Sequence, residues 1–467
     1  MSKASLALFF LLGSAMRSLA QNPSSDEVTS RAVQRCAAQA VVWGMPAVNF
    51  DLMLQAAIKN KSAANQIVYW SRLPSWKNQT LTPNPDAIYL MPFINTKDGP
   101  IVLEIPPADE GSITGSVDDA WQTAVEDVGP AGLDQGKGGK YVILPPDRKF
   151  KLPADYLPLS PDTFQSYALL RSILKSGSDA DVAKAVAYGK RIKLYPLSQA
   201  AAPPDTKFVD VIDDVYDATI PYDMRFFDSL NRIVQTEPWL DRDRVMIDCL
   251  KTLGIEKGKS YHPSDEVATA TKRGMDEAHA WVEVNYEKLY AQPFNPGLHW
   301  ALPASPELVK AMESDFVDPN SYPVDTRGLT YSLAFFSAKH LGAGQYYLMT
   351  INDKEGKTLE GRHTYRLTVP ANAPVNQYWS ATVYNRATHA FIRDARWMSR
   401  SSQTPGLQQN PDGSVDIYFA PKPRAGKESN WVPINADGQF EVLFRFYGPE
   451  KSLFEKTWKL PDIEKLP

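Results

Sequence analysis

The sequence predicts an α+β fold in which two antiparallel β-sandwich modules, jelly-roll-like in pattern, flank a central helical section. Three observations predict it: short β-rich runs between residues 88 and 144, apolar residues at helical spacing between 164 and 290, and a period of two from about residue 346. The chain has 467 residues, more than the roughly 250–300 at which a single core usually stops growing. We therefore expect at least two domains.

The first twenty residues have the pattern of a signal peptide. Lys3 precedes an almost wholly apolar stretch, residues 4–15, and Ser18 and Ala20 supply the small residues expected before a cleavage site. An uncleaved membrane anchor is the alternative, but the stretch is shorter than the roughly 20 residues needed to cross a bilayer. No later apolar run is expected to reach that length. The mature protein is therefore expected in the periplasm or outside the cell, without a transmembrane segment.

Residues 21–195 are predicted to form the N-terminal module, a helix followed by a β-sandwich. Ser24 and Glu27 match a capping box at the start of an amphipathic helix over residues 26–58, which Pro46 is expected to interrupt. Brief β-rich runs at 88–90, 101–105 and 141–144 are separated by Gly- and Pro-containing turns. These runs are predicted to be strands.

Residues 196–330 are predicted to form the helical connecting section. Apolar positions recur at helical spacing over 222–235, 242–253 and 264–290, and also over 164–175 and 179–188 in the preceding module. Ser264 is a candidate N-cap for the longest helix, because Asp265 and Glu266 follow it and favour the positive helix start. We therefore expect five helices in these ranges.

Residues 331–467 are predicted to form the C-terminal, jelly-roll-like β module. In residues 440–447 the side chains of Phe440, Val442, Phe444 and Phe446 alternate with those of the opposite face, so one face is expected to be core. Similar alternation occurs over 365–369, 377–384 and 415–419. Asp-Gly pairs at 412–413 and 437–438 indicate hairpin turns between such strands.

Composition excludes several classes of function. The 50 Lys and Arg residues against 54 Asp and Glu residues give a net charge of −4, which provides no basic surface for nucleic-acid phosphates. Two cysteines, Cys36 and Cys249, cannot form a zinc ribbon or an iron–sulfur site. They could pair in an oxidising compartment, but two buried free thiols are the alternative, and the sequence leaves both open. Neither a metal nor an organic cofactor is predicted.

Several stretches resemble those of bacterial proteins that join the domains of unknown function 1254 and 1214. In the first module they are residues 82–86 (Thr-Pro-Asn-Pro-Asp) with Tyr89, and residues 99–106. In the second they are residues 378–384, 410–418, 430–433 and 444–449. Residues 120–141 depart from the pattern of many members, which suggests a distinct subgroup. The resemblance implies two β modules with helices between and around them; it implies no particular reaction.

The candidate site residues are those at which aromatic rings stand beside carboxylates and amides in the sequence. Rings stack on sugar or apolar faces, and neighbouring polar groups hold hydroxyls. The candidate acid/base residues are Asp86, Asp118 and Asp127. The candidate ligand-binding residues are Asn84, Tyr89, Trp121, Arg225, Trp379 and Tyr384. Each also has a structural interpretation, because Trp and Tyr fill sandwich cores and Asn84 begins a natural Asx turn.

The sequence therefore favours a secreted or periplasmic enzyme, hydrolytic in type, that acts on a small or carbohydrate-like molecule in an aromatic-lined cleft. The motif Gly-x-Ser-x-Gly of α/β-hydrolases is absent, so no serine nucleophile is assigned. The alternative is a non-catalytic ligand-binding or envelope-assembly protein with the same cleft. A homo-oligomer is left open.

Overall fold

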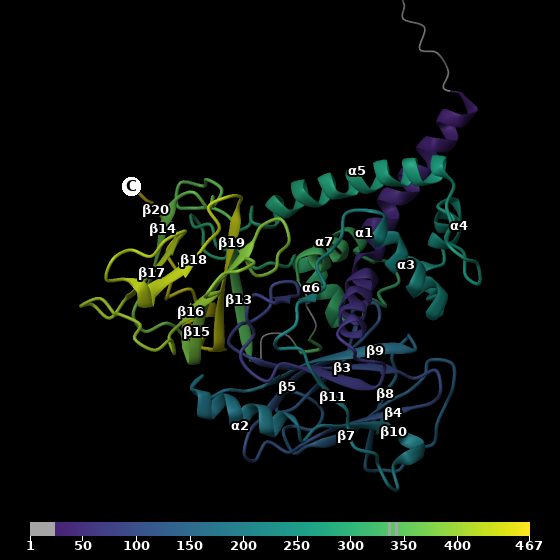
Figure 1. Cartoon of the computed structure of the whole chain (residues 1–467), viewed down its shortest axis with the longest axis horizontal. Helices are drawn as coiled ribbons and strands as arrows, with labels where there is room; N and C mark the ends of the chain where they lie inside the picture. Colours follow the sequence, from purple (N-terminus) through teal and green to yellow (C-terminus); the bar gives the residue numbers. More distant parts are fainter. Residues whose placement is uncertain (1–23, 335–337, 341–343) are drawn as a thin grey trace, which may run out of the picture.

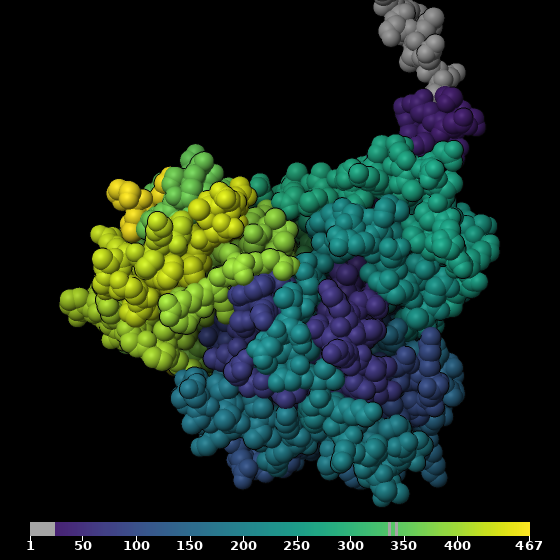
Figure 2. Space-filling model, viewed as in Figure 1, coloured from purple at the N-terminus to yellow at the C-terminus, as the bar shows by residue number. Residues whose placement is uncertain are grey.

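The computed structural model of the protein describes residues 24–334, 338–340 and 344–467. The predicted signal peptide, residues 1–20, lies outside the described residues. In Figure 1 the sheets of the N-terminal module lie at the bottom, the helices occupy the centre and upper right, and the C-terminal β module lies at the left. The surfaces of the two β modules adjoin in the space-filling view (Figure 2). A mixed α+β fold with several sheets and a central helical section is thus confirmed.

Three sheets belong to the N-terminal half of the chain. The first has six strands in the order β11 (Phe208–Asp210), β1 (Gln66–Tyr69), β3 (Ile88–Asn95), β9 (Gln165–Ser172), β5 (Ile113–Asp119) and β6 (Ala124–Val128). The second has four, β10 (Lys193–Pro196), β4 (Ile101–Ile105), β7 (Gly139–Ile143) and β8 (Tyr156–Leu159), and a two-stranded sheet pairs β12 (Tyr216–Asp217) with β2 (Asn78–Gln79). Most pairs are antiparallel as predicted, but β1–β11, β2–β12 and β7–β8 are parallel.

The six-stranded sheet is buried on both faces. One face shares a hydrophobic cluster with the four-stranded sheet, through residues such as Leu90, Leu103 and Leu170. The other packs on the helices through residues such as Met91 and Leu169. This two-sided burial explains why the helix predicted over residues 164–175 is wrong. The central strand β9 is apolar on both faces, so the run carries no period of two, and its spacing also fits a helix.

Eight α-helices and three short 3₁₀ segments are described. The α-helices are α1 (Ser25–Lys59), α2 (Asp179–Gly189), α3 (Met224–Thr236), α4 (Met246–Thr252), α5 (Asp265–Leu289), α6 (Pro306–Glu313), α7 (Val324–Leu333) and α8 (Lys451–Phe454). The 3₁₀ segments are η1 (Leu197–Gln199), η2 (Asp241–Asp243) and η3 (Glu428–Asn430). The predicted caps form: Ser24 Oγ accepts from the Glu27 N–H at 3.1 Å, and Ser264 Oγ accepts from the Val267 N–H at 3.4 Å.

Helix α1 is the axis of the helical section, and the predicted interruption at Pro46 is wrong. The helix continues through Pro46, which is buried inside it. Its length and apolar composition would suit a membrane span, contrary to our expectation for the mature chain, but 83% of the most apolar window is buried inside the protein. Figure 1 shows α3, α5 and α7 around it. The apolar character of α1 is thus accounted for by its central place in the core.

Glycines allow α5 and α7 to approach α1 closely. A Cβ atom on Gly328 of α7 would lie 2.3 Å from the Val42 carbonyl oxygen, and one on Gly274 of α5 would lie 2.4 Å from the Gln34 carbonyl oxygen. Pro46 has no N–H to give to Val42, the residue four positions before it. Gly328 therefore packs against a carbonyl that has lost its helical partner, so α7 supports α1 where proline would otherwise weaken it.

The C-terminal module contains two four-stranded sheets. One has the order β13 (Gln345–Thr350), β19 (Phe440–Pro449), β15 (Val375–Asn385) and β16 (Ser399–Ser401). The other has the order β18 (Trp431–Pro433), β17 (Val415–Ala420), β14 (Thr364–Val369) and β20 (Glu464–Leu466), with β17–β18 parallel. Both contribute to one hydrophobic cluster, which contains the predicted core residues Phe440, Val442, Phe444 and Phe446.

The opposite face of β19 is also buried, because α5 and the N-terminal module cover it. Glu441 is 0% exposed, and its Oε1 lies 2.9 Å from Nδ1 of the buried His389. The Tyr286 hydroxyl of α5 donates to the other oxygen of Glu441, and the Arg386 guanidinium lies 3.9 Å from the centre of the Tyr286 ring. A buried polar network thus joins the helical section to the C-terminal module.

Cys36 and Cys249 are free thiols in the structure, and both are half-buried. The Cys249 Sγ lies 3.5 Å from the Cys36 carbonyl oxygen, which brings α4 against α1. Of the two possibilities left open by the sequence, the structure therefore has the free thiols.

Candidate functional site

An aromatic groove lies between the helical section, the loop before α7 and the edge of the N-terminal module. It consists of two adjoining depressions of about 740 and 540 Å³ that share Arg242 and Tyr322. Both volumes fall in the range of about 300–1,000 Å³ that is typical of small-molecule sites. The five rings in its lining are Trp43, Trp239, Trp281, Phe316 and Tyr322. We call this feature the aromatic groove.

The rings of the groove are held by stacking and by a buried acid. Trp43 lies 6.3 Å from Trp239 with an angle of 16° between the rings, and 4.7 Å from Trp121 below it. The Trp43 Nε1–H donates to Asp243 Oδ1 at 2.8 Å, and Asp243 is 1% exposed. Trp43 is therefore fixed from both sides, whereas Trp239 is half-buried and presents part of its surface to solvent.

The charge of the groove is strongly acidic. Six carboxylates are among its described lining residues: Asp162, Asp241, Asp243, Asp318, Asp325 and Glu277. Arg242 is the one basic residue in that lining. Its Nε lies 3.5 Å from Asp243 Oδ2, and its guanidinium lies 5.4 Å from the centre of the Tyr322 ring. Because Arg242 is already paired, the carboxylates at the rim determine the charge that a ligand meets.

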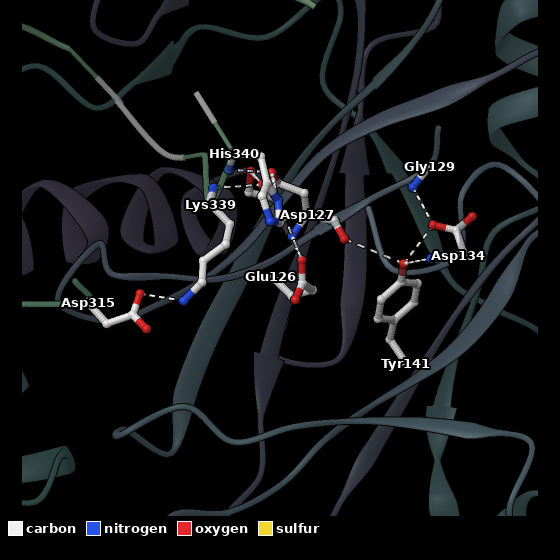
Figure 3. A network of polar contacts seen from close by, with 9 residues as sticks. Glu126, Asp127, Gly129, Asp134, Tyr141, Asp315, Lys339 and His340 are labelled. Carbon is white, nitrogen blue, oxygen red and sulfur yellow. Dashed lines mark hydrogen bonds and ion pairs between the residues drawn. The ribbon is translucent and has the colours of Figure 1, made fainter. Parts of the chain in front are cut away.

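The candidate acid Asp127 does not line the groove but holds residues 339 and 340, which follow α7 and contact the groove loop. Its carboxylate accepts from the backbone N–H groups of Lys339 and His340, at 2.9 and 2.8 Å, and lies 3.0 Å from His340 Nδ1. Lys339 Nζ in turn pairs with Asp315, which immediately precedes Phe316 of the groove (Figure 3). Asp127 thus connects strand β6 to the groove loop through two links.

The other two candidate acids lie elsewhere. Asp118 is 0% exposed on β5, two residues from Ser116, which pairs with Asp127 of β6. Asp86 is half-buried at the boundary with the C-terminal module, where Ser399 Oγ donates to it at 3.3 Å. Asp86 therefore does not join Asp118 and Asp127 in one site.

The ligand-binding candidates separate into one group of three residues and three single residues. Asn84, Tyr89 and Tyr384 lie together where the two β modules meet: the Asn84 N–H donates to the Tyr89 hydroxyl at 3.0 Å, and the Tyr384 hydroxyl donates to the Pro83 carbonyl at 2.6 Å. Trp121 is buried and packs against Trp43 of the aromatic groove. Arg225 is exposed at the start of α3, where it pairs with Asp223, and Trp379 stacks on Phe444 in the C-terminal core. The sequence candidates are therefore not one site.

Burial shapes the acid–base behaviour of Asp86. Desolvation raises the pKa of its carboxyl above the ordinary value, and the nearby Arg445 charge and the Ser399 hydrogen bond only partly oppose this effect. The folded protein therefore holds this proton at pH values where the unfolded chain has released it. The stability that the protonated form contributes is present at low pH and is lost as the pH rises through the folded-state pKa.

Replacing Asp86 with asparagine is accordingly expected to change the pH dependence of stability. From about pH 4 upward, the free energy of unfolding of the wild type should fall relative to that of Asp86→Asn, because asparagine keeps an acceptor for Ser399 but carries no charge. Urea unfolding at pH 4, 5, 6 and 7 measures the difference. A wild type that gains stability over Asp86→Asn as the pH rises would contradict the raised pKa.

The fold and the site together define a class of protein: a two-module α+β protein with a central helical section and an aromatic groove beside it. Models of two families match the chain, "Protein of unknown function (DUF1254)" over residues 64–196 and "Protein of unknown function (DUF1214)" over residues 344–451. The chain thus belongs to the proteins that combine these two domains, as the resemblance implied.

Two solved structures were found to be similar to the chain, and the first of them shares its fold. The VPA0106 protein from Vibrio parahaemolyticus is 18% identical, with a TM-score of 0.58 over 93% of this chain and 100% of that chain. An uncharacterised protein from Burkholderia cenocepacia is 10% identical, with a TM-score of 0.40 over 94% of this chain and 95% of that one. The search of curated proteins found no match.

The sequence did not indicate most of the groove residues. Trp43, Trp239 and Tyr322 come from segments about 80 to 280 residues apart, and only the fold brings them together. One feature of the sequence could have indicated the groove. Trp239 follows a proline and precedes Asp241-Arg242-Asp243, so a large ring stands beside charged residues at the start of a predicted helix.

Proposed function

We propose that the protein binds a small, carbohydrate-like molecule in the aromatic groove. The observation that carries the proposal is a ligand-sized groove in which five aromatic rings stand among six carboxylates. Aromatic faces stack on the C–H faces of sugar rings, and carboxylates accept hydrogen bonds from hydroxyls. This proposal corresponds to the ligand-binding alternative that the sequence left open. The sequence did not indicate the aromatic groove as the site.

The negative charge at the rim of the groove indicates which carbohydrates bind best. Asp162 and Asp241 are exposed at the groove, and Asp318 is half-buried there. A cleft lined by one sign of charge attracts the opposite sign and repels its own. A cation over an aromatic face also gains about 0.5–2 kcal/mol. Carbohydrates with amino groups are therefore favoured over neutral ones, and acidic carbohydrates are disfavoured.

Three oligosaccharides of equal length, built from glucosamine, glucose and galacturonic acid, test this order. The melting temperature should rise most with the glucosamine oligomer, less with the glucose oligomer and not at all with the galacturonic acid oligomer, because ligands that bind only the folded state stabilise it. Trp239→Ala should weaken binding about tenfold, the loss expected for roughly 1.4 kcal/mol of stacking. Isothermal titration calorimetry measures both effects.

Trp397→Ala is the matched control, because Trp397 is 37% exposed and is not among the residues that line the groove. It should bind as the wild type does. Equal shifts with all three oligosaccharides, or unchanged affinity in Trp239→Ala, would contradict the proposal.

Hydrolysis of the bound molecule is the second candidate function. The observation that favours it is the His340 ring, which is more than half exposed and whose Nδ1 lies 3.0 Å from Asp127, the arrangement of an oriented general base. His340 is not among the residues that line the groove and is connected to the groove loop through the ion pair of Lys339 with Asp315. Mass spectrometry of the same oligosaccharide mixtures after long incubation would reveal cleavage products. Hydrolysis thus stays a prediction from the sequence. The same holds for a periplasmic or secreted location, for the jelly-roll topology and for self-association.

A further inference from the structure

The two β modules meet at residues 82–86, which the C-terminal module holds by polar contacts. Arg445 of β19 donates through Nη2 to the Thr82 carbonyl at 3.0 Å and to the Tyr384 hydroxyl at 2.6 Å, and through Nη1 to Thr382 Oγ1 at 2.8 Å. The Asn84 amide donates to the Tyr447 hydroxyl. The stretches that carry the family resemblance in the two modules are thus joined here.

Two arginines at this junction, Arg171 and Arg445, form no ion pair with a carboxylate among the described residues. Arg445 is 3% exposed, and Arg171 of β9 has a buried Nε with no hydrogen-bond partner among the described residues. No described carboxylate lies within 4.0 Å of either guanidinium. Asp86, which is nearby, turns its carboxylate to Ser399 instead. A buried charge without a close counter-charge costs several kcal/mol. Asp86 interacts electrostatically with Arg445 but is not within 4.0 Å of it, so the junction lacks a close negative charge among the described residues.

Both arginines line one small cavity. It measures about 50 Å³, and its wall also includes Asn84, Tyr89 and Tyr347. A second cavity of about 30 Å³ adjoins it and shares Thr82, Tyr89 and Arg171. A single water needs about 10–15 Å³ on this measure, so the space admits a group of a few non-hydrogen atoms but not a sugar ring.

We propose that this junction cavity binds a small oxyanion, which Arg171 of the first module and Arg445 of the second hold between them. The planar guanidinium group matches the geometry of carboxylate and phosphate oxygens and is less strongly hydrated than an ammonium group. The second amide hydrogen of Asn84 and the hydroxyl of Tyr89 supply further donors at the wall, whereas the Tyr347 hydroxyl already donates to Gln345. The anion supplies the missing negative charge and links the two modules, independently of the aromatic groove.

The test compares phosphate and acetate with chloride at equal ionic strength, using the full chain. The melting temperature of the wild type should rise with millimolar phosphate or acetate and saturate, and calorimetry should give a Kd that is at least tenfold higher for Arg171→Met. If only phosphate raises the melting temperature, the ligand is a free tetrahedral anion. If acetate raises it as well, the site also accepts a carboxylate group.

Arg171→Met should itself melt at the wild-type temperature or above it when no anion is present, since it removes an uncompensated buried charge. If Arg171 had only a structural role, Arg171→Met would melt at a lower temperature than the wild type. Arg171→Lys keeps the charge and should retain part of the anion response even if methionine perturbs the fold. Arg225→Met, an exposed arginine away from the cavity, should respond as the wild type does. An anion response that persists in Arg171→Met, or no response in any of the four proteins, would overturn the proposal.

Discussion

Replacing His389 with alanine is expected to lower the free energy of unfolding by about 3 kcal/mol or more, the cost of leaving a buried charged group without its partner. His389 Nδ1 lies 2.9 Å from Glu441 Oε1, and the side chains are 5% and 0% exposed. After the change, Glu441 keeps the Tyr286 hydroxyl but loses its other partner. Urea unfolding at pH 7 measures the loss.

A second substitution separates the charge from the cavity that alanine leaves. In the His389→Ala background, Glu441→Gln should restore part of the stability, because a neutral amide costs less to bury unpaired than a carboxylate does. His262→Ala, at an exposed position, should stay within about 0.5 kcal/mol of the wild type. If His389→Ala is as mild as His262→Ala, the network does not join the helical section to the C-terminal module as we describe.

Replacing Gly328 with alanine is expected to cost about 2–3 kcal/mol, within the usual range for overpacking a close contact. The new Cβ would lie 2.3 Å from the Val42 carbonyl oxygen and 2.9 Å from a Val42 methyl group, and the first of these contacts is with backbone that cannot rotate away. Helix α7 must then move off α1. Thermal unfolding of the variant should show a lower melting temperature.

Gly344→Ala is the control for this prediction, because a Cβ there meets no atom of the described residues within 4 Å. It should leave the melting temperature almost unchanged. Gly274→Ala should behave like Gly328→Ala, since its Cβ would lie 2.4 Å from the Gln34 carbonyl oxygen on the same helix α1. Tolerance of both helix substitutions would show that α5 and α7 do not pack on α1 at the distances found.

The parts of the fold that sequence reasoning predicted are those specified by local signals. The long helix α5 begins at Ser264 because a serine cap and two acidic residues act within one turn. The strand β19 alternates because one face meets the second sheet. Strand β9 and the continuity of α1 through Pro46 depend on neighbours far away in sequence, namely the strands beside β9 and Gly328 against Val42. No local pattern contains that information.

The same distinction applies to the sites. Asn84, Tyr89 and Tyr384 were selected for their chemistry, and they do lie together, but at the junction cavity rather than in a groove. The sequence did not indicate Arg171 and Arg445 as a pair, because Arg171 lies in the run 164–175 that the spacing predicted to be a helix, and Arg445 occupies an ordinary alternating position of a strand. Their significance depends on the absence of a carboxylate beside them, which only packing of the two modules determines. The aromatic groove likewise depends on how α1, η2 and the loop before α7 meet.

The central claim, that the aromatic groove receives a carbohydrate-like ligand, is tested most directly by a crystal structure of the protein soaked with a glucosamine oligosaccharide. Our account predicts a sugar ring stacked on Trp239 with an amino group within hydrogen-bond distance of Asp162, Asp241 or Asp318. An empty groove at saturating ligand, or a sugar bound only at another surface of the protein, would contradict it.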